Sequence, residues 1–262
     1  MKKILSLFLP LLLLISCMQS AFEDNAETKA YDVYGDCEQL LDTADLELYS
    51  FVPFTDEEMK TVDYSTQLER RQIPEDWLQK MSTKAVFYQF VLCELSWNMY
   101  VHNSAQAGFK AVTKELNILP ELLSRPDAGH VLIELLQEIE LSEIRGEGCF
   151  HLYECIQRTL AQPEIIAHMT EDDISQYIDL AMNHQTTIKD LSKANPSQWS
   201  YPESLAAPFY GLANVMLRFD YEPFRLLIET DPQLNGFMEG GNLKNEQTLL
   251  LIHNCLTDFN KH

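Results

Sequence analysis

The sequence is poor in glycine, and it lacks the short motifs that mark most catalytic and cofactor-binding sites. Nine of its 262 residues are glycine, and none belongs to a glycine-rich phosphate loop or to a Gly-x-Ser-x-Gly turn around a nucleophilic serine. A His-Glu-x-x-His run, which would place two zinc ligands on one helix face, is also missing. We therefore predict that the chain is not an enzyme, and we assign no catalytic, cofactor-binding or metal-binding residue.

Basic residues are scarce as well. The chain has 19 Lys and Arg against 40 Asp and Glu, which gives a formal net charge of -21 at pH 7. Such a surface repels phosphate backbones and anionic lipid headgroups, so we expect neither nucleic-acid binding nor electrostatic docking on a membrane. The excess of acid permits a cationic partner, but a well-solvated surface is the simpler interpretation.

No apolar run is long enough to stay in a membrane, but a shorter one stands at the start of the chain. Lys2 and Lys3 precede a mostly apolar stretch over residues 4–15, whereas a membrane-spanning helix needs about 20 apolar residues. A charged start followed by about 7 to 15 apolar residues is typical of a secretory signal. We predict that residues 1–16 are a signal peptide.

The end of this stretch, Leu14-Ile15-Ser16-Cys17, resembles the cleavage site of bacterial lipoproteins. The resemblance implies a lipid on the sulfur of Cys17, cleavage before this residue and acylation of the freed amine. Several acyl chains on one residue anchor a protein stably. We therefore expect a protein of the cell envelope that is held by lipid at the outer membrane, on its periplasmic face or at the cell surface. The alternative is an ordinary signal peptide with a cysteine near the cut.

Few cysteines remain once Cys17 is set aside. Five are left, an odd number, so at least one stays free or pairs between chains. This number is too small for a dense disulfide framework at this length, and buried thiols are the default interpretation. The five are Cys37, Cys93, Cys149, Cys155 and Cys255.

Residues 17–72 are acidic and rich in turn-forming residues, and we predict that they form a tether and an N-terminal extension. Within them, Asp42-Thr43-Ala44 resembles the short acceptor for O-linked glycans on exported proteins of Bacteroidetes-type bacteria.

From residue 73 onward the apolar residues have helical spacing, without a convincing run of period-two alternation. We predict an all-α domain over 73–262, built of amphipathic helices that pack laterally. Three helix starts are marked by Pro126-Asp127, by Thr170 with Asp173, and by Asn242 or Asn245. Pro208 predicts a kink or a helix boundary. The three apolar stripes are Val131, Leu132, Leu135, Leu136 and Ile139; Ile174, Ile178, Ala181, Ile188 and Leu191; and Leu249, Ile252, Leu256 and Phe259.

A Pro-Glu dipeptide recurs with a spacing close to the roughly 40 to 47 residues of two- and three-helix solenoid repeats. This spacing favours an α-solenoid-like stack of the HEAT or armadillo kind. An irregular helical bundle remains the alternative, because Pro followed by Glu is favoured at any helix start. The prolines are Pro74, Pro120, Pro163 and Pro202.

The segment 143–155 gathers the most side chains that could bind a metal. If it were helical throughout, four of them would share one face, namely Glu143, Glu147, His151 and Cys155. Gly146 and Gly148 indicate instead that one helix ends here and another begins. We therefore interpret the segment as buried thiols, Cys149 and Cys155, beside a half-exposed His151. His130, with Glu134 four residues on, and His184, near the rim of the second stripe, are expected to be surface or packed residues rather than bases or ligands.

Three stretches resemble a group of uncharacterised lipoproteins from gut Bacteroidetes. They are Met81–Ala85, Ala107–Val112 and Pro120–Gly129, and the similarity covers roughly residues 73 to 140. The stretch Glu115–Leu119 departs from that pattern, since it lacks an Asn-Gly turn. The resemblance implies an exported helical protein of unassigned activity, so it transfers no catalytic residue.

These observations lead to one hypothesis and two alternatives. The hypothesis is a lipid-anchored helical scaffold or binding protein of the bacterial envelope, which binds the membrane through the lipid on Cys17 and a protein partner through its helices. The first alternative is an immunity or inhibitor lipoprotein whose acidic residues bind a cationic toxin or enzyme by electrostatic complementarity. The second is an envelope hydrolase that uses a pair of carboxylates.

Overall fold

The computed structural model describes residues 46–52 and 55–261, and in these ranges it is all-α, without strands, as the sequence predicted. The signal peptide 1–16, the lipid attachment at Cys17 and the glycan motif at Asp42 lie outside the described residues. Among the helices that are described, none is both long and apolar enough to cross a membrane.

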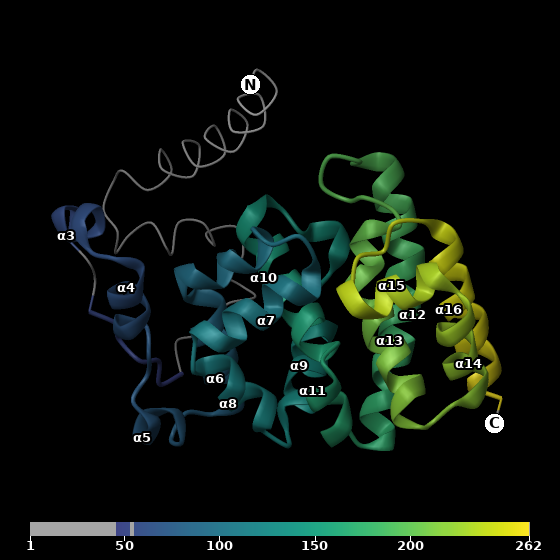
Figure 1. The fold of residues 1–262 in the computed structure, drawn as a ribbon, viewed down its shortest axis with the longest axis horizontal. Helices are drawn as coiled ribbons and strands as arrows, with labels where there is room; N and C mark the ends of the chain where they lie inside the picture. Colours follow the sequence, from purple (N-terminus) through teal and green to yellow (C-terminus); the bar gives the residue numbers. More distant parts are fainter. Residues whose placement is uncertain (1–45, 53–54, 262) are drawn as a thin grey trace.

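The helices follow one another with short connections (Figure 1). Two of them, α3 and α4, fall within the predicted extension 17–72. The first half contains α3 (Asp56–Thr61), α4 (Tyr64–Arg70), α5 (Glu75–Leu78), α6 (Thr83–Leu92), the 3-10 helix η2 (Glu94–Tyr100), α7 (Ala105–Glu115), α8 (Ile118–Ser124), α9 (Ala128–Gln137) and η3 (Leu141–Glu143). The second half contains α10 (Gly146–Leu160), α11 (Pro163–His168), α12 (Glu171–Ala194), η4 (Glu203–Leu205), α13 (Ala206–Arg218), α14 (Glu222–Thr230), α15 (Pro232–Gly240) and α16 (Glu246–Phe259).

Each Pro-Glu dipeptide stands at the start of a short helix that precedes a longer one. Pro74 caps α5 before α6, Pro163 is the first residue of α11 before α12, and Pro202 precedes η4 before α13. Pro120 lies in the first turn of α8, before α9. The fixed φ of proline and its missing N–H suit these positions, where the N–H has no helical acceptor. The repeat seen in the sequence therefore corresponds to a recurring pair of a short and a long helix.

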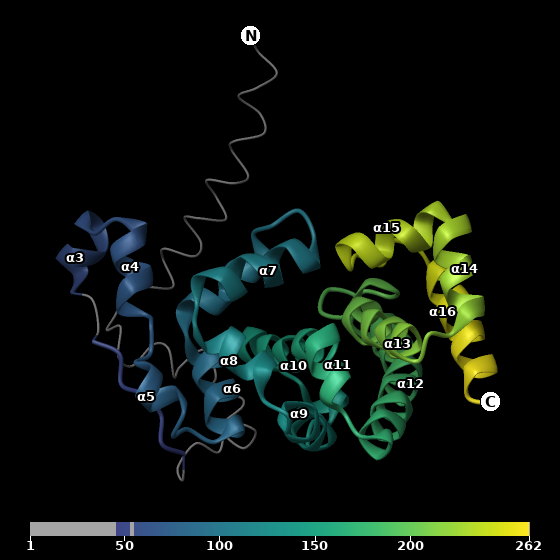
Figure 2. The same cartoon turned by 60° about the horizontal axis from the view of Figure 1, so that its bottom comes forward.

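These pairs stack side by side around α10. The long helices α6, α9 and α12 are neighbours in one row, and α8, α11 and α13 are neighbours in another. Helix α10 contacts α6, α9, α11 and α13. The last helices fold back, so that α15 contacts α7 from the first half of the chain (Figure 2). The arrangement is a short helical stack whose two halves meet again at α7 and α15.

The helix starts have the expected chemistry in two of the three cases. Thr170 and Asp173 form a capping box at α12, and the Asn245 side chain accepts a hydrogen bond from the backbone of Thr248 at α16. Asp127 does not cap α9, because its carboxylate accepts a hydrogen bond from the hydroxyl of Thr83 instead. Pro208 lies in the first turn of α13, directly after η4, so a helix boundary falls there.

One continuous core holds the stack together, and the three predicted stripes contribute to it. Every residue of the stripes is buried or partly buried against that core. Helix α10 is buried on almost every side, although it carries His151, Glu154 and Gln157. Its buried polar side chains depend on internal hydrogen bonds, although Gln157 Oε1 and Thr159 Oγ1 find no partner among the described residues.

Candidate functional site

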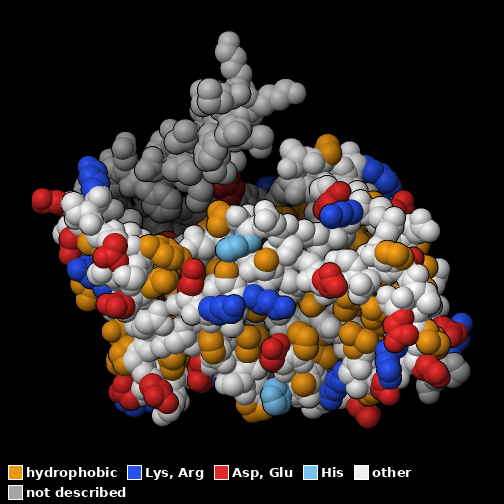
Figure 3. Space-filling view, in the orientation of Figure 1, with side chains coloured by type: hydrophobic (Ala, Val, Ile, Leu, Met, Phe, Trp, Pro, Cys, Tyr) orange, Lys and Arg blue, Asp and Glu red, His pale blue; other side chains and the backbone are white. Residues whose placement is uncertain are grey.

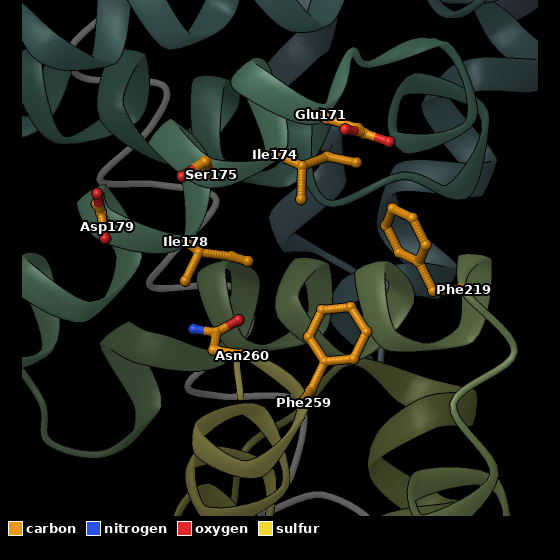
Figure 4. Close-up of a pocket in the computed structure, with 8 residues that line it drawn as sticks. All are labelled: Glu171, Ile174, Ser175, Ile178, Asp179, Phe219, Phe259 and Asn260. Atoms are coloured by element: carbon orange, nitrogen blue, oxygen red, sulfur yellow. The ribbon is translucent and has the colours of Figure 1, made fainter. Parts of the chain in front are cut away.

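A groove of about 410 Å³ lies where α12 meets the ends of α13 and α16. Four apolar side chains, two on α12 and two rings at the helix ends, converge on its opening (Figure 4). The lining consists of Glu171, Ile174, Ser175, Ile178, Asp179, Phe219, Phe259 and Asn260. The groove therefore has an apolar interior and polar edges.

The floor of this groove comes from the amphipathic period of α12. Ile174 and Ile178 are one helical turn apart, so they share a face, and they are 5 % and 7 % exposed. The capping box at Thr170 fixes the start of α12 one turn before Ile174, since it satisfies two backbone N–H groups that would otherwise lack partners.

The aromatic wall is held by contacts between three rings. The centroids of Phe219 and Phe259 are 5.6 Å apart, and Tyr221 meets Phe259 edge-on at 5.3 Å. The Tyr221 hydroxyl donates a hydrogen bond of 2.9 Å to the carboxylate of Asp258, which fixes the end of α16. Phe219 nevertheless remains 45 % exposed. The guanidinium of Arg218 lies over this ring, and the rest of the ring faces the groove and solvent.

Acidic side chains lie at the edge of the groove. Its lining contains the carboxylates of Glu171 and Asp179, and the described lining residues include no Lys or Arg. Glu171 also lies in the first turn of α12, where the helix dipole favours a negative charge. Asp179 lies mid-helix, outside the reach of that effect, and it is exposed. The groove thus combines apolar contact area with two carboxylates at its edge, and the guanidinium of Arg218 lies 5.5 Å from the centroid of the Phe219 ring.

The segment 143–155 does not form a metal site. Gly146, with a φ of 72°, begins α10, so Glu143 belongs to η3 and leaves the face of the later residues, as the two glycines indicated. Glu147 is exposed, whereas His151 and Cys155 point into the core. Across the described residues, no three His, Cys, Asp or Glu side chains gather closely enough to hold a metal ion.

The prediction of a half-exposed His151 is wrong, because the ring is only 1 % exposed. The Ser96 hydroxyl lies 2.9 Å from its Nε2, and the Tyr100 hydroxyl lies 2.9 Å from its Nδ1. Trp97 stacks on the ring at 4.1 Å. Burial lowers the pKa of His151 to about 3, so the ring is neutral at ordinary pH. These partners are some 50 residues away in the sequence, and so the local pattern gave no sign of them.

Ser96 and His151 have the spacing of a nucleophile and its general base. Ser96, however, is 0 % exposed, and Trp97 covers the ring of His151. A substrate has no route to the hydroxyl. We therefore interpret the pair as part of the hydrogen bonding that satisfies the buried ring of His151 in the core.

The other histidines are packed or surface residues. His184 is only 7 % exposed and lies 3.2 Å from the amide nitrogen of Gln157, and burial lowers its pKa to about 4. His130 is 57 % exposed and lies near the carboxylates of Asp173 and Glu134. None of these histidines lines the groove.

The cysteines differ from the simple expectation of buried thiols. Cys93 and Cys155 are free and buried, and Cys255 is free and partly exposed. Cys149 is instead disulfide-bonded.

The sequence pointed to part of the groove. Ile174, Ile178 and Phe259 were recognised as members of apolar stripes, but Phe219 was not singled out. The sequence also gave no sign that the ends of α13 and α16 meet beside α12.

Comparison with known proteins adds no identification. No family model, no curated protein sequence and no solved structure matches the chain.

Proposed function

We propose that this chain is a lipid-anchored binding protein of the bacterial envelope, held at the outer membrane, and that it is not an enzyme. In this proposal the groove between α12, α13 and α16 binds a basic, amphipathic segment of a partner protein. The observation that carries the proposal is the exposed ring of Phe219 beside an apolar trough edged by Glu171 and Asp179. The disulfide at Cys149 supports export, because disulfides persist in oxidising compartments.

We propose an amphipathic helix as the ligand of the groove, because its apolar side chains would contact Ile174, Ile178 and the two phenylalanine rings. Amphipathic helices bind apolar grooves through residues on one face, and aromatic side chains supply much of the binding energy at such contacts. Lysine or arginine residues beside the apolar face of the ligand would meet Glu171 and Asp179. Such charge pairs at a rim raise the association rate and make it depend on salt.

On the face seen in Figure 3, the acidic side chains do not gather into one broad patch. In the view of Figure 3, acidic side chains lie at several separate places, with Lys, Arg and neutral side chains between them. A protein that neutralises a cationic toxin by charge complementarity would have its acidic residues clustered on one face. The groove supplies a smaller recognition site for a basic segment, and a toxin would be one such partner.

The two acids of the groove are poorly placed for hydrolysis. Glu171 and Asp179 are eight residues apart on one helix, which corresponds to about 12 Å along its axis. Paired carboxylates of glycosidases stand about 5 to 9.5 Å apart on opposite sides of the bond that breaks. This arrangement favours binding over catalysis.

Titration of the full chain in detergent with labelled peptides tests the groove. The probes are an amphipathic helical peptide of leucine and lysine and its leucine and glutamate counterpart, followed by fluorescence anisotropy. We expect the basic peptide alone to bind, and we expect Phe219→Ala with Phe259→Ala to weaken binding about 30-fold, which corresponds to about 2 kcal/mol for aromatic anchors. Leu226→Ala, an exposed leucine on α14, is the matched control. Equal binding of both peptides, or full affinity in the Phe double variant, would refute the proposal.

A separate experiment tests the anchor. Cys17→Ser is expected to abolish incorporation of radiolabelled fatty acid and to release the protein from the membrane fraction. Protease treatment of intact cells then distinguishes the cell surface from the periplasmic face. Continued labelling of the Ser variant would refute acylation at Cys17 without affecting the groove.

A further inference from the structure

A second hollow, of about 200 Å³, shares no lining residue with the groove. It lies between the first half of the chain and the segment that joins α15 to α16. It has room for several water molecules, and so for a small ligand. Its polar lining comes from three parts of the chain and comprises Tyr100, His102, Asn103, Ser104, Arg158 and Asn242.

Arg158 is the charged group of this hollow. Its Nε donates a hydrogen bond of 2.8 Å to the carboxylate of Glu154, and its guanidinium lies 5.2 Å from the centre of the Tyr100 ring. The side chain is 17 % exposed. No described residue accepts a hydrogen bond from its two Nη atoms. Burial works against the charge of Arg158, but the neighbouring Glu154 outweighs this effect and raises the pKa of the guanidinium, so it stays protonated.

The rest of the lining is suited to an anion. The described lining residues include no Asp or Glu, in a chain whose net charge is -21. The hollow also lies at the start of α7, where Ser104 is the capping residue, and the helix dipole there favours negative charge. The start of α7 and the guanidinium of Arg158 thus belong to the same small space.

Hydrogen bonds across the chain hold this lining in shape. The Asn242 side chain accepts a hydrogen bond of 3.0 Å from the backbone of Ala105 and donates one of 3.2 Å to the carbonyl oxygen of Asn103. These contacts join residues that are 137 and 139 positions apart. A site that is already formed binds with less loss of conformational freedom.

We propose that this hollow binds a small carboxylate, which the two Nη atoms of Arg158 hold side by side. The planar guanidinium matches a carboxylate in two parallel hydrogen bonds, a geometry that a lysine cannot reproduce. The asparagine, serine and histidine side chains then contact the remainder of the ligand. A free organic acid and the carboxyl terminus of a peptide share this chemistry. The inference is independent of the groove and of its partner.

The test uses NMR titration of the full chain in detergent, with three probes. N-acetylglycine represents a peptide terminus, acetate represents a simple acid, and N-acetylglycinamide is the neutral control. We expect saturable shifts at the hollow with a Kd on the order of 1 mM for N-acetylglycine, as befits so small a ligand, and none for the amide. Weaker binding of acetate would favour the peptide terminus as the source, and equal binding would favour a free acid.

Two variants complete the test. Arg158→Lys is expected to weaken binding at least tenfold, because it keeps the charge but removes the two-pronged donor. Arg225→Lys, at an exposed arginine paired with Asp220, is the matched control and should bind normally. If Arg158→Lys fails to fold, Asn103→Phe provides the second test of the proposal. The phenylalanine side chain would fill the hollow from its exposed rim, so this variant should not bind the carboxylate. Equal binding of the amide, or an undiminished affinity in Arg158→Lys or Asn103→Phe, would overturn the proposal.

Discussion

A Cβ atom added at Gly108 would lie 1.9 Å from the backbone carbonyl oxygen of Met99. Real Cβ contacts are never this short, so α7 and η2 pack at a distance that only glycine permits at this position. The obstacle is backbone rather than a flexible side chain, and it cannot move aside alone. The close approach also brings η2 and α7 together at the hollow that contains Arg158.

Gly108→Ala should therefore destabilise the protein. Overpacking a tight contact costs about 1 to 3 kcal/mol or more, which outweighs the roughly 1 kcal/mol that alanine gains over glycine in a helix. Gly236→Ala is the matched control, because it lies in α15 and a Cβ there meets nothing within 4 Å. Urea unfolding should show a lower midpoint for the first variant and an equal or higher one for the second. Equal midpoints for Gly108→Ala and the wild type would contradict the packing described here.

The capping box of α12 yields a second prediction. Thr170→Ala removes the hydroxyl that accepts a hydrogen bond from the backbone of Asp173 and donates one to its carboxylate, so stability should fall by about 1 kcal/mol. Thr170→Ser keeps the hydroxyl and should stay within a few tenths of a kcal/mol of the wild type. Hydrogen exchange at the first turn of α12 should rise in the Ala variant alone. A loss of equal size in both variants would show that the methyl group, rather than the cap, supplies the stability.

The prediction of the fold succeeded where the signal is local. The period of Ile174, Ile178 and Ala181, and the pairing of Thr170 with Asp173, are fixed by residues within a few positions of each other. The apolar period and the capping pair could therefore be predicted from the sequence alone.

The same reasoning failed for contacts made across the chain. His151 is buried because Ser96, Trp97 and Tyr100 enclose it, and these side chains come from another helix. Phe219 lies beside Phe259, 40 positions later, only because α16 returns to the end of α13. A single sequence gives no measure of such distances, so part of the groove and the whole hollow around Arg158 were not predicted.

The two buried histidines predict a loss of stability in mild acid. The pKa of His151 is lowered to about 3 and that of His184 to about 4, both by burial, from 6.5 in the unfolded chain. The unfolded state therefore binds more protons below pH 6.5, and stability falls as the pH drops from 6.5 toward these lower values. Between pH 6.5 and 5 each histidine should cost about 1.5 kcal/mol.

Urea unfolding at pH 7, 6 and 5 measures this loss, and His184→Gln should remove about half of it. His130 acts in the opposite sense, since its pKa is raised by its hydrogen bond to Asp173, so the stability that it contributes is present below pH 6.5 and is lost as the pH rises through its raised pKa. NMR titration should show that the ring of His151 stays neutral at pH 5. A ring that titrates near pH 6.5 would refute its burial.

The free thiols should differ in their reactivity toward iodoacetamide. Burial raises the pKa of Cys93 to about 12 and that of Cys155 well above its ordinary value, and both side chains are almost inaccessible. The thiolate is the reactive form, so both should remain unmodified in the native protein. Cys255 is partly exposed on α16, and although its pKa is also raised, chiefly by partial burial, it should react first.

Peptide mapping by mass spectrometry after labelling at pH 8 checks this order. Cys93 and Cys155 should become labelled only in urea, and Cys149 only after reduction as well, because its sulfur is in a disulfide. Labelling of Cys155 at the rate of Cys255 in the native protein would mean that α10 is not enclosed by its neighbours, and the sealed environment of His151 would then be wrong too.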